Sequence, residues 1–160
     1  MTQPTYTVPG LDLADAGTVI DALQMRLHAL NDLHLTLKHI HWNVVGPNFV
    51  AVHEMLDPQI DDVRLMADAV AERIATLGGV PVGTPGALVA ARTWEEYTLG
   101  KADAMTHLKA LDAFLGTVIG GHREAVDATG DLDAVTEGIV LAQLEELEKY
   151  LWFVRAHLDR

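Results

Sequence analysis

The sequence contains no cysteine and no serine. The absence of cysteine excludes disulfides and thiolate chemistry, and it suits a reducing cytoplasm. The absence of serine excludes a Gly-x-Ser-x-Gly nucleophile elbow, and with it the serine hydrolases that are built on that turn.

Positive charge is also scarce. The chain has 11 Lys and Arg against 23 Asp and Glu, a formal net charge of −12, and its first basic residue is Arg26. Affinity for nucleic acids comes largely from Lys and Arg side chains that neutralise phosphates. The composition therefore argues against a general nucleic-acid surface, and an acidic shell instead attracts cations.

Long apolar runs are missing as well. No segment approaches the roughly 20 apolar residues of a membrane-spanning helix, and none has the basic start and apolar stretch of a signal peptide. Yet 49% of the 160 residues are apolar, which is ample for one hydrophobic core. We expect one soluble, cytoplasmic domain over residues 13–160, preceded by a flexible N-terminal tail over residues 1–12.

Apolar residues recur at helical spacing through most of the chain. A short helix is expected at Pro85–Ala91, inside a connection rich in proline and glycine. Four long helices are predicted: from a cap at Asp12 or Asp15 to about Val44, from Phe49 to Gly78, from a capping box at Thr93-Trp94-Glu95-Glu96 to about Ala128, and from Asp131 or Asp133 to the C-terminus.

The predicted fold is therefore all-α, a four-helix bundle with a short extra helix in its middle connection. Three glycines, Gly116, Gly120 and Gly121, interrupt the third long helix. Each costs about 1 kcal/mol relative to alanine in a helix, so close packing or a kink is expected there.

The second long helix has two distinct faces. Its apolar face has residues at steps of three and four, typical of a helix packed in a bundle: Phe49, Val52, Leu56, Ile60, Val63, Ala67, Val70, Ile74 and Leu77. A second face carries His53, Asp57, Asp68 and Glu72, which fall within roughly 100° of one another around the helix. Asp57 and Asp68 lie roughly 16 Å apart along the axis, so one metal ion cannot bind both within one chain.

The numbering of these residues indicates a two-fold axis. Positions 53 and 72, 57 and 68, and 61 and 64 all share one centre, between Asp62 and Val63. An antiparallel copy of the helix about that centre places His53 opposite Glu72 of the partner subunit and brings the two aspartates together. Asp61 and Arg64 would form reciprocal ion pairs there, as a symmetric interface requires.

We therefore predict two metal sites per dimer, each built from both subunits, with His41 as an additional imidazole ligand. The alternative is an ordinary solvated helix face, because charged residues at helical spacing often have no other role. Three further histidines, His28, His34 and His39, are interpreted as core residues, since a histidine in an apolar stripe is more often structural than a ligand.

The stretch HWNVVGPNFVAVHEMLDPQID, followed by MADAVAERIATLGG, resembles the signature region of the Dps family, the mini-ferritins named as DNA-binding proteins from starved cells. The resemblance extends from about Leu13 to Leu158 and is strongest to actinobacterial members. It implies a ferritin-like bundle, a hollow dodecamer and ferroxidase sites at two-fold interfaces. The chain has no Glu-x-x-His motif for a di-iron site inside the bundle.

Carried over by residue, the resemblance implies that His41, His53 and Asp57 of one subunit and Asp68 and Glu72 of the other hold up to two iron ions. It implies oxidation of Fe(II) by hydrogen peroxide, in preference to dioxygen, and storage of Fe(III) as a mineral, which would detoxify iron and peroxide together.

The resemblance implies roles for three further residues. Trp42 would supply an electron or quench radicals, although ordinary packing also explains a tryptophan. Asp127 and Asp131 would line an ion-entry pore, and changing both to Asn should slow iron uptake. Direct DNA binding is not expected, because the tail lacks the lysines that family members use for it.

Two other functions stay open from the residues alone. A metal held by histidine and carboxylate can activate water, so a metal-dependent hydrolase of amide or ester bonds is one alternative. A structural cage with an inert interface is the other. Iron-dependent turnover would separate the cage from both enzymes.

Overall fold

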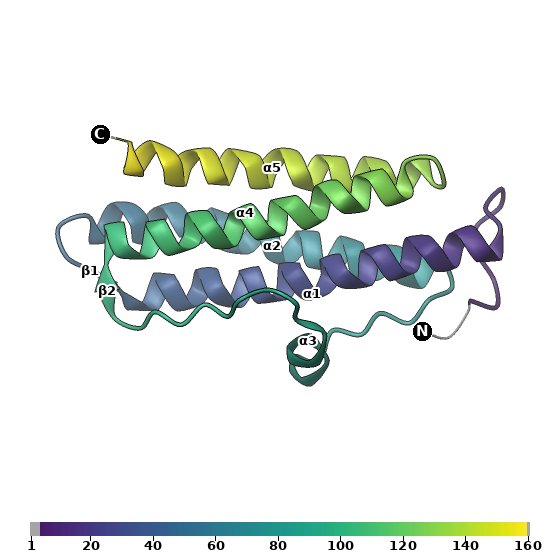
Figure 1. The fold of residues 1–160 in the computed structure, drawn as a ribbon, viewed down its shortest axis with the longest axis horizontal. Helices are drawn as coiled ribbons and strands as arrows, with labels where there is room; N and C mark the ends of the chain where they lie inside the picture. Colours follow the sequence, from purple (N-terminus) through teal and green to yellow (C-terminus); the bar gives the residue numbers. More distant parts are fainter. Residues whose placement is uncertain (1–3, 160) are drawn as a thin grey trace.

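The computed structural model describes residues 4–159, so residues 1–3 of the predicted tail and residue 160 lie outside it. Five helices form in this part of the chain: α1 (Leu13–Asn43), α2 (Phe49–Thr76), α3 (Pro85–Ala91), α4 (Ala104–Thr129) and α5 (Ala134–Leu158). The four long helices run side by side, and α3 lies outside them (Figure 1). The all-α prediction of a ferritin-like bundle with a short extra helix is confirmed.

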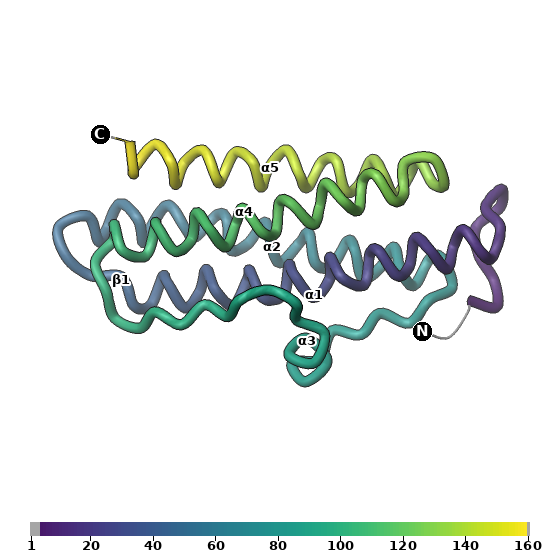
Figure 2. Tube along the Cα trace, in the orientation of Figure 1, coloured from purple at the N-terminus to yellow at the C-terminus, as the bar shows by residue number. Residues whose placement is uncertain are grey.

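The bundle is made of two helix pairs. Helix α1 packs chiefly on α2 and α4 on α5, while contacts between α1 and α4 join the pairs. Every residue of the apolar face predicted for α2 is buried except Phe49, which is 38% exposed. The connection from α2 to α4 crosses back along the whole bundle (Figure 2). Within the described residues, no helix is long and apolar enough to cross a membrane.

Two very short strands fasten one end of the bundle. Strand β1 (Val44–Val45) pairs in parallel with β2 (Ala102–Asp103), with Val44 opposite Ala102. Because β1 follows α1 directly and β2 precedes α4, this pairing holds the end of α1 beside the beginning of α4.

The predicted start of the third long helix is wrong. Helix α4 begins at Ala104, where the Asp103 carboxylate accepts a hydrogen bond of 3.1 Å from the backbone N–H of Thr106. The predicted capping box at 93–96 lies in an extended segment instead. Trp94 donates its indole N–H to the buried Asp32 of α1 at 2.7 Å, which holds this segment along α1 and away from a helical path.

The segment that precedes α1 in the sequence lies beside the C-terminal end of α2 in space. The Tyr6 hydroxyl donates to the Ala75 carbonyl at 3.3 Å. Gly78 has a φ of +85°, and a Cβ there would lie 2.1 Å from the Tyr6 carbonyl oxygen, so only glycine fits. Val8 and Leu11 pack against the core. The flexibility proposed for residues 1–12 stays a prediction, and α1 begins after Asp12, one of its two predicted caps.

Close packing of a glycine in α4 is found at Gly121, where a Cβ would lie 2.0 Å from Nη1 of the buried Arg26. We expect Gly121→Ala to destabilise the fold by about 1–2 kcal/mol, because the clash outweighs the gain in helix propensity. Gly120 has open space at its Cβ position, so Gly120→Ala is the matched control and should stabilise by up to about 1 kcal/mol. Chemical denaturation measures both, and equal effects of the two substitutions would contradict the packing argument.

A buried histidine in α4 predicts acid sensitivity. His122 is fully buried and donates through Nδ1 to the Val118 carbonyl at 2.9 Å. Burial lowers the pKa of His122 from 6.5 to about 4. Between these values the unfolded chain binds a proton that the folded chain does not, so stability is lost as the pH falls through this window.

A pKa difference of one unit corresponds to about 1.4 kcal/mol. The loss of unfolding free energy that is due to His122 should therefore reach roughly 3 kcal/mol near pH 4. Urea unfolding of the wild type and of His122→Leu at several pH values measures it, because the leucine variant lacks this contribution. His157→Gln, at an exposed position, is the control. A difference between wild type and His122→Leu that does not change with pH would refute the prediction.

Candidate metal centre

Three of the predicted ligands meet at one end of the bundle. His41 lies in the last turn of α1, and His53 and Asp57 lie one turn apart near the beginning of α2. Gly46, with a φ of +93°, helps to reverse the chain between the two helices. One nitrogen of each histidine and one carboxylate oxygen all lie within 4.8 Å of one another, a grouping that can hold a metal ion.

The backbone fixes the tautomer of His53. Its Nδ1 lies 2.9 Å from the His41 carbonyl oxygen, and a carbonyl only accepts, so Nδ1 carries the hydrogen. In the neutral ring, Nε2 then keeps a lone pair that can bind a metal ion. Proteins commonly orient metal-binding histidines by a hydrogen bond from the other ring nitrogen. Phe49 supports the ring from one side, with a centroid separation of 4.9 Å.

The two imidazoles stack, with ring centroids 3.6 Å apart and planes at 26°. Burial and the nearby His53 lower the pKa of His41, and together they outweigh the opposing charge of Asp57. His41 is therefore neutral near pH 7, which is the state in which imidazole binds a metal.

His41 has no fully satisfying partner among the described residues. Its Nε2 lies 2.8 Å from Oδ1 of Asp57, but both ring nitrogens are buried and neither makes a well-aligned hydrogen bond to a described residue. A buried unpaired nitrogen beside a carboxylate suits a bound cation.

Asp68 and Glu72 lie on the exposed side of α2, outside this cluster. They follow Asp57 along the same helix by about three and four turns. One subunit therefore brings together His41, His53 and Asp57 and leaves the other two predicted ligands facing outward. This is the arrangement that the two-fold hypothesis requires, and the dimer itself stays a prediction.

Several large apolar side chains of α1 and α2 are exposed. Trp42 is 70% exposed, Leu35 55% and Leu65 52%, all on α1 and α2. The ammonium group of Lys38 lies 6.0 Å from the centroid of the Trp42 ring.

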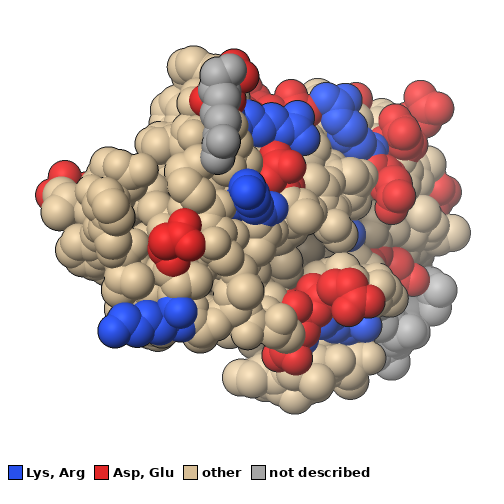
Figure 3. Space-filling model, turned by 60° about the vertical axis from the view of Figure 1, so that its left-hand side comes forward, with Lys and Arg blue, Asp and Glu red and all other residues tan. Residues whose placement is uncertain are grey.

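The remaining predicted residues lie elsewhere. Asp127 and Asp131 are exposed at the end of α4 and in the turn that follows, and their role in a pore stays a prediction. Two of the histidines interpreted as core residues contact backbone carbonyls. Nδ1 of His34 lies 3.2 Å from the Ile60 oxygen, and Nε2 of His39 lies 2.7 Å from the Leu99 oxygen. On the face shown in Figure 3, Lys and Arg side chains are dispersed among Asp and Glu side chains and form no continuous basic patch.

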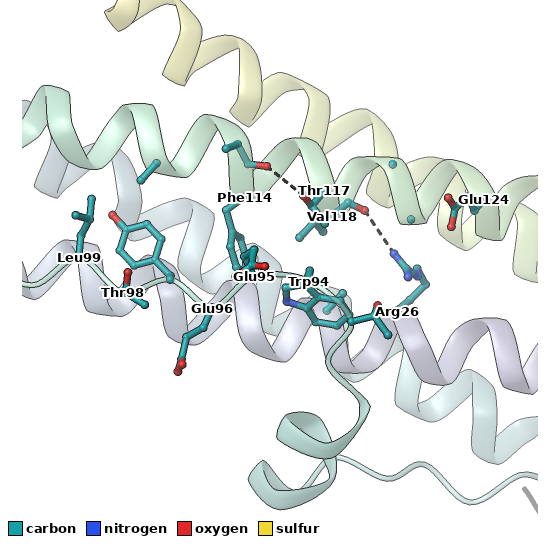
Figure 4. A pocket seen from close by; sticks show the side chains of 17 residues that line it. Arg26, Trp94, Glu95, Glu96, Thr98, Leu99, Phe114, Thr117, Val118 and Glu124 are labelled. Carbon is teal, nitrogen blue, oxygen red and sulfur yellow. Dashed lines mark hydrogen bonds between the residues drawn. The ribbon is translucent and has the colours of Figure 1, made fainter.

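A large cavity is separate from the histidine cluster. It is a groove of about 730 Å³ between α1, α4 and the extended segment before α4. Arg26, Trp94 and Phe114 point into it, and Glu124 lies at one end (Figure 4). Tyr97 also lines this groove.

Comparison with known proteins places the chain in a family. The sequence profile of the ferritin-like domain matches residues 20–160. A DNA protection during starvation protein of Mycolicibacterium smegmatis is 53% identical over 155 residues, or 97% of this chain and 85% of that protein. The fine tangled pili major subunit of Haemophilus ducreyi is also 53% identical, over 96% of this chain and 82% of that protein.

Comparison with solved structures leads to the same family. DpsA14 from Streptomyces coelicolor has a TM-score of 0.98 at 61% identity and covers 99% of this chain and 94% of its own. Mycobacterium smegmatis Dps has a TM-score of 0.96 at 52% identity and covers 100% of this chain and 90% of its own. The chain belongs to the ferritin-like family and, within it, to the Dps proteins of the actinobacterial type.

Proposed function

We propose that this protein oxidises Fe(II) at sites shared between subunits and stores the Fe(III) product. The observation that carries the proposal is the cluster of His41, His53 and Asp57, in which His41 has a buried, unpaired nitrogen beside a carboxylate. Membership of the ferritin-like family supports iron as the metal.

Each half-site offers two imidazoles and one carboxylate, ligands that suit ferrous iron and leave coordination positions free for further ligands and an oxidant. We place Asp68 and Glu72 of a second subunit opposite this cluster. Asp61 and Arg64, both exposed on α2, would pair across the same axis. The exposed Leu65 of α2 would be covered by the contact.

The proposed reaction uses two ferrous ions and one hydrogen peroxide. Each Fe(II) gives up one electron, the O–O bond of the peroxide breaks, and two protons complete two water molecules. Peroxide would be the preferred oxidant over dioxygen, and two-electron reduction would avoid release of hydroxyl radical. Up to two ions would occupy each site, and the ferric product would pass to a mineral inside a hollow dodecamer.

The other parts of the proposal concern transport and surroundings. Asp127 and Asp131 would line the entry pore for ferrous ions, and Trp42, beside His41, would supply an electron or quench radicals. The protein would work in the cytoplasm, and its net charge of −12 supports attraction of cations over direct binding of DNA.

The experiment that tests the proposal is anaerobic loading of metal-free protein with ferrous iron, followed by hydrogen peroxide. We expect rapid appearance of Fe(III) absorbance and a ferric core that stays soluble and elutes with the protein. Oxidation no faster than in buffer, with precipitation of ferric hydroxide, would refute it. Metal-dependent cleavage of amide or ester substrates in that case would favour the hydrolase alternative.

A further inference from the structure

A tyrosine and a histidine form a tight hydrogen-bonded pair outside the metal cluster. Tyr97 lies in the extended segment before α4, and His107 lies in the first turns of α4. The phenol oxygen of Tyr97 is 2.7 Å from Nδ1 of His107, and His107 is fully buried. The proposed iron chemistry leaves this pair without a role.

The direction of this hydrogen bond follows from the surroundings. Burial raises the pKa of Tyr97, so its hydroxyl keeps the proton and donates. Burial also lowers the pKa of His107, although the Asn43 backbone and Asp103 oppose it and His39 reinforces it. His107 is therefore neutral, with Nδ1 as the acceptor and the hydrogen on Nε2, which is buried without a well-aligned partner.

A phenol that gives up an electron must also give up its proton, because the oxidised phenol is a strong acid. A neutral imidazole nitrogen at 2.7 Å is placed to accept that proton and to return it later. The pair therefore meets the chemical requirement for reversible one-electron oxidation of a tyrosine inside a protein.

The pair is connected to the metal cluster through α1. The rings of His39 and Tyr97 meet edge to face, with centroids 6.1 Å apart. His39 and His41 are two positions apart on α1, so their side chains leave it on nearly opposite sides. Tyr97 lies beyond the ring of His39, so α1 separates it from the cluster by more than one helix diameter of roughly 10–12 Å.

We propose that Tyr97, with His107 as its proton acceptor, is a one-electron redox site that completes peroxide reduction when only one ferrous ion is bound. This inference rests on the proposed ferroxidase function. Fe(II) and Tyr97 each give one electron, the O–O bond breaks, and two protons from solvent complete the water molecules. The products are Fe(III), two waters, a Tyr97 phenoxyl radical and a protonated His107.

The groove provides a way to restore the tyrosine. Tyr97 lines it together with Trp94 and Phe114, and the groove is open to solvent. Trp94 and Phe114 are labelled in Figure 4. A soluble one-electron reductant that enters the groove can return an electron to the phenoxyl ring, while His107 returns the proton across the same hydrogen bond.

Electron paramagnetic resonance after rapid freezing tests this inference. Protein loaded anaerobically with one ferrous ion per site is mixed with hydrogen peroxide, and ring-deuterated tyrosine identifies the radical as tyrosyl. We expect a tyrosyl signal in the wild type, loss of it in Tyr97→Phe, and its retention in Tyr150→Phe. His107→Gln, which has no comparable base, should give a weaker and shorter-lived signal.

Three outcomes would overturn the inference. They are the absence of a tyrosyl signal while iron is oxidised, a signal that survives in Tyr97→Phe, and a signal assigned to tryptophan alone. In each of them the ferroxidase proposal stands, because Fe(III) formation is followed in parallel samples that are loaded with two ions per site. Failure of the wild type to oxidise iron at either loading would instead remove both proposals.

Discussion

Replacing Asp68 and Glu72 together by alanine is expected to abolish rapid oxidation of ferrous iron by peroxide. The two carboxylates lie outside the cluster of their own subunit, and we assign them to the site of the neighbour. Loss of groups that only support a ligand typically costs 10–100-fold in metal affinity, so loss of two ligands should slow the reaction by at least about 100-fold. Stopped-flow absorbance of Fe(III) measures the rate.

A matched control removes two negative charges elsewhere. Glu54 and Glu145 are exposed, so Glu54→Ala with Glu145→Ala gives the same change in net charge without touching the predicted ligands. We expect this control to oxidise iron at the wild-type rate. If the Asp68 and Glu72 double variant also does so, these carboxylates are no ligands and the two-fold argument fails.

A second large effect is expected at Asp32, which is 5% exposed in the middle of α1. Its carboxylate accepts hydrogen bonds from Nε and Nη2 of Arg92 at 3.0 and 2.8 Å, and from Trp94 at 2.7 Å. Asp32→Ala leaves the largely buried Arg92 guanidinium with only the exposed Glu96 as a partner. Removing one partner of a buried pair should cost about 3–5 kcal/mol of unfolding free energy.

The same arginine supplies the control for this prediction. Glu96 lies 3.5 Å from Nη1 of Arg92, but its side chain is 69% exposed. Exposed ion pairs contribute about 0–1 kcal/mol, so Glu96→Ala should change the stability little. Denaturant unfolding compares the two variants. Similar, small losses for both would show that the Asp32 network does not hold the connection in place.

Helices were predictable where local chemistry decides them. Asp12 accepts hydrogen bonds from the backbone of Ala14 and Asp15, at 2.9 and 2.8 Å, and α1 begins where that cap predicts. Pro85 opens α3 as expected for a proline in a first turn. In each case residues within one turn determine the boundary, so the sequence pattern is sufficient.

The start of α4 was mispredicted because a distant residue decides it. Thr93 and Glu96 satisfy the pattern of a capping box. However, Trp94 binds Asp32, which lies 62 positions earlier in the chain, and β2 pairs with β1. A sequence pattern contains no information about such contacts. Asp32 was missed for the same reason, since an aspartate within a helix gives no sign that an arginine from another element will meet it.

The cluster of His41, His53 and Asp57 was predictable in composition but not in detail. The shared centre of positions 53 with 72 and 57 with 68 singles out the residues without any coordinates. It cannot reveal that the His41 carbonyl orients His53, that the two imidazoles stack, or that Phe49 contacts His53. These contacts depend on how the turn after α1 folds back onto α2.

The most direct test of an intersubunit site is complementation between two inactive variants. One variant carries His53→Ala with Asp57→Ala, and the other carries Asp68→Ala with Glu72→Ala. Each removes one half of every site, so each alone should be inactive. In a mixed dimer, one of the two sites combines both intact halves.

Unfolding and refolding the two variants together at equal amounts should restore roughly a quarter of wild-type iron oxidation, since half of randomly formed dimers are mixed and half of their sites are intact. Variants that are refolded separately and then combined provide the baseline. Recovery towards this value is the result that we predict. A co-refolded mixture that is as inactive as its parents would contradict a site built from two subunits.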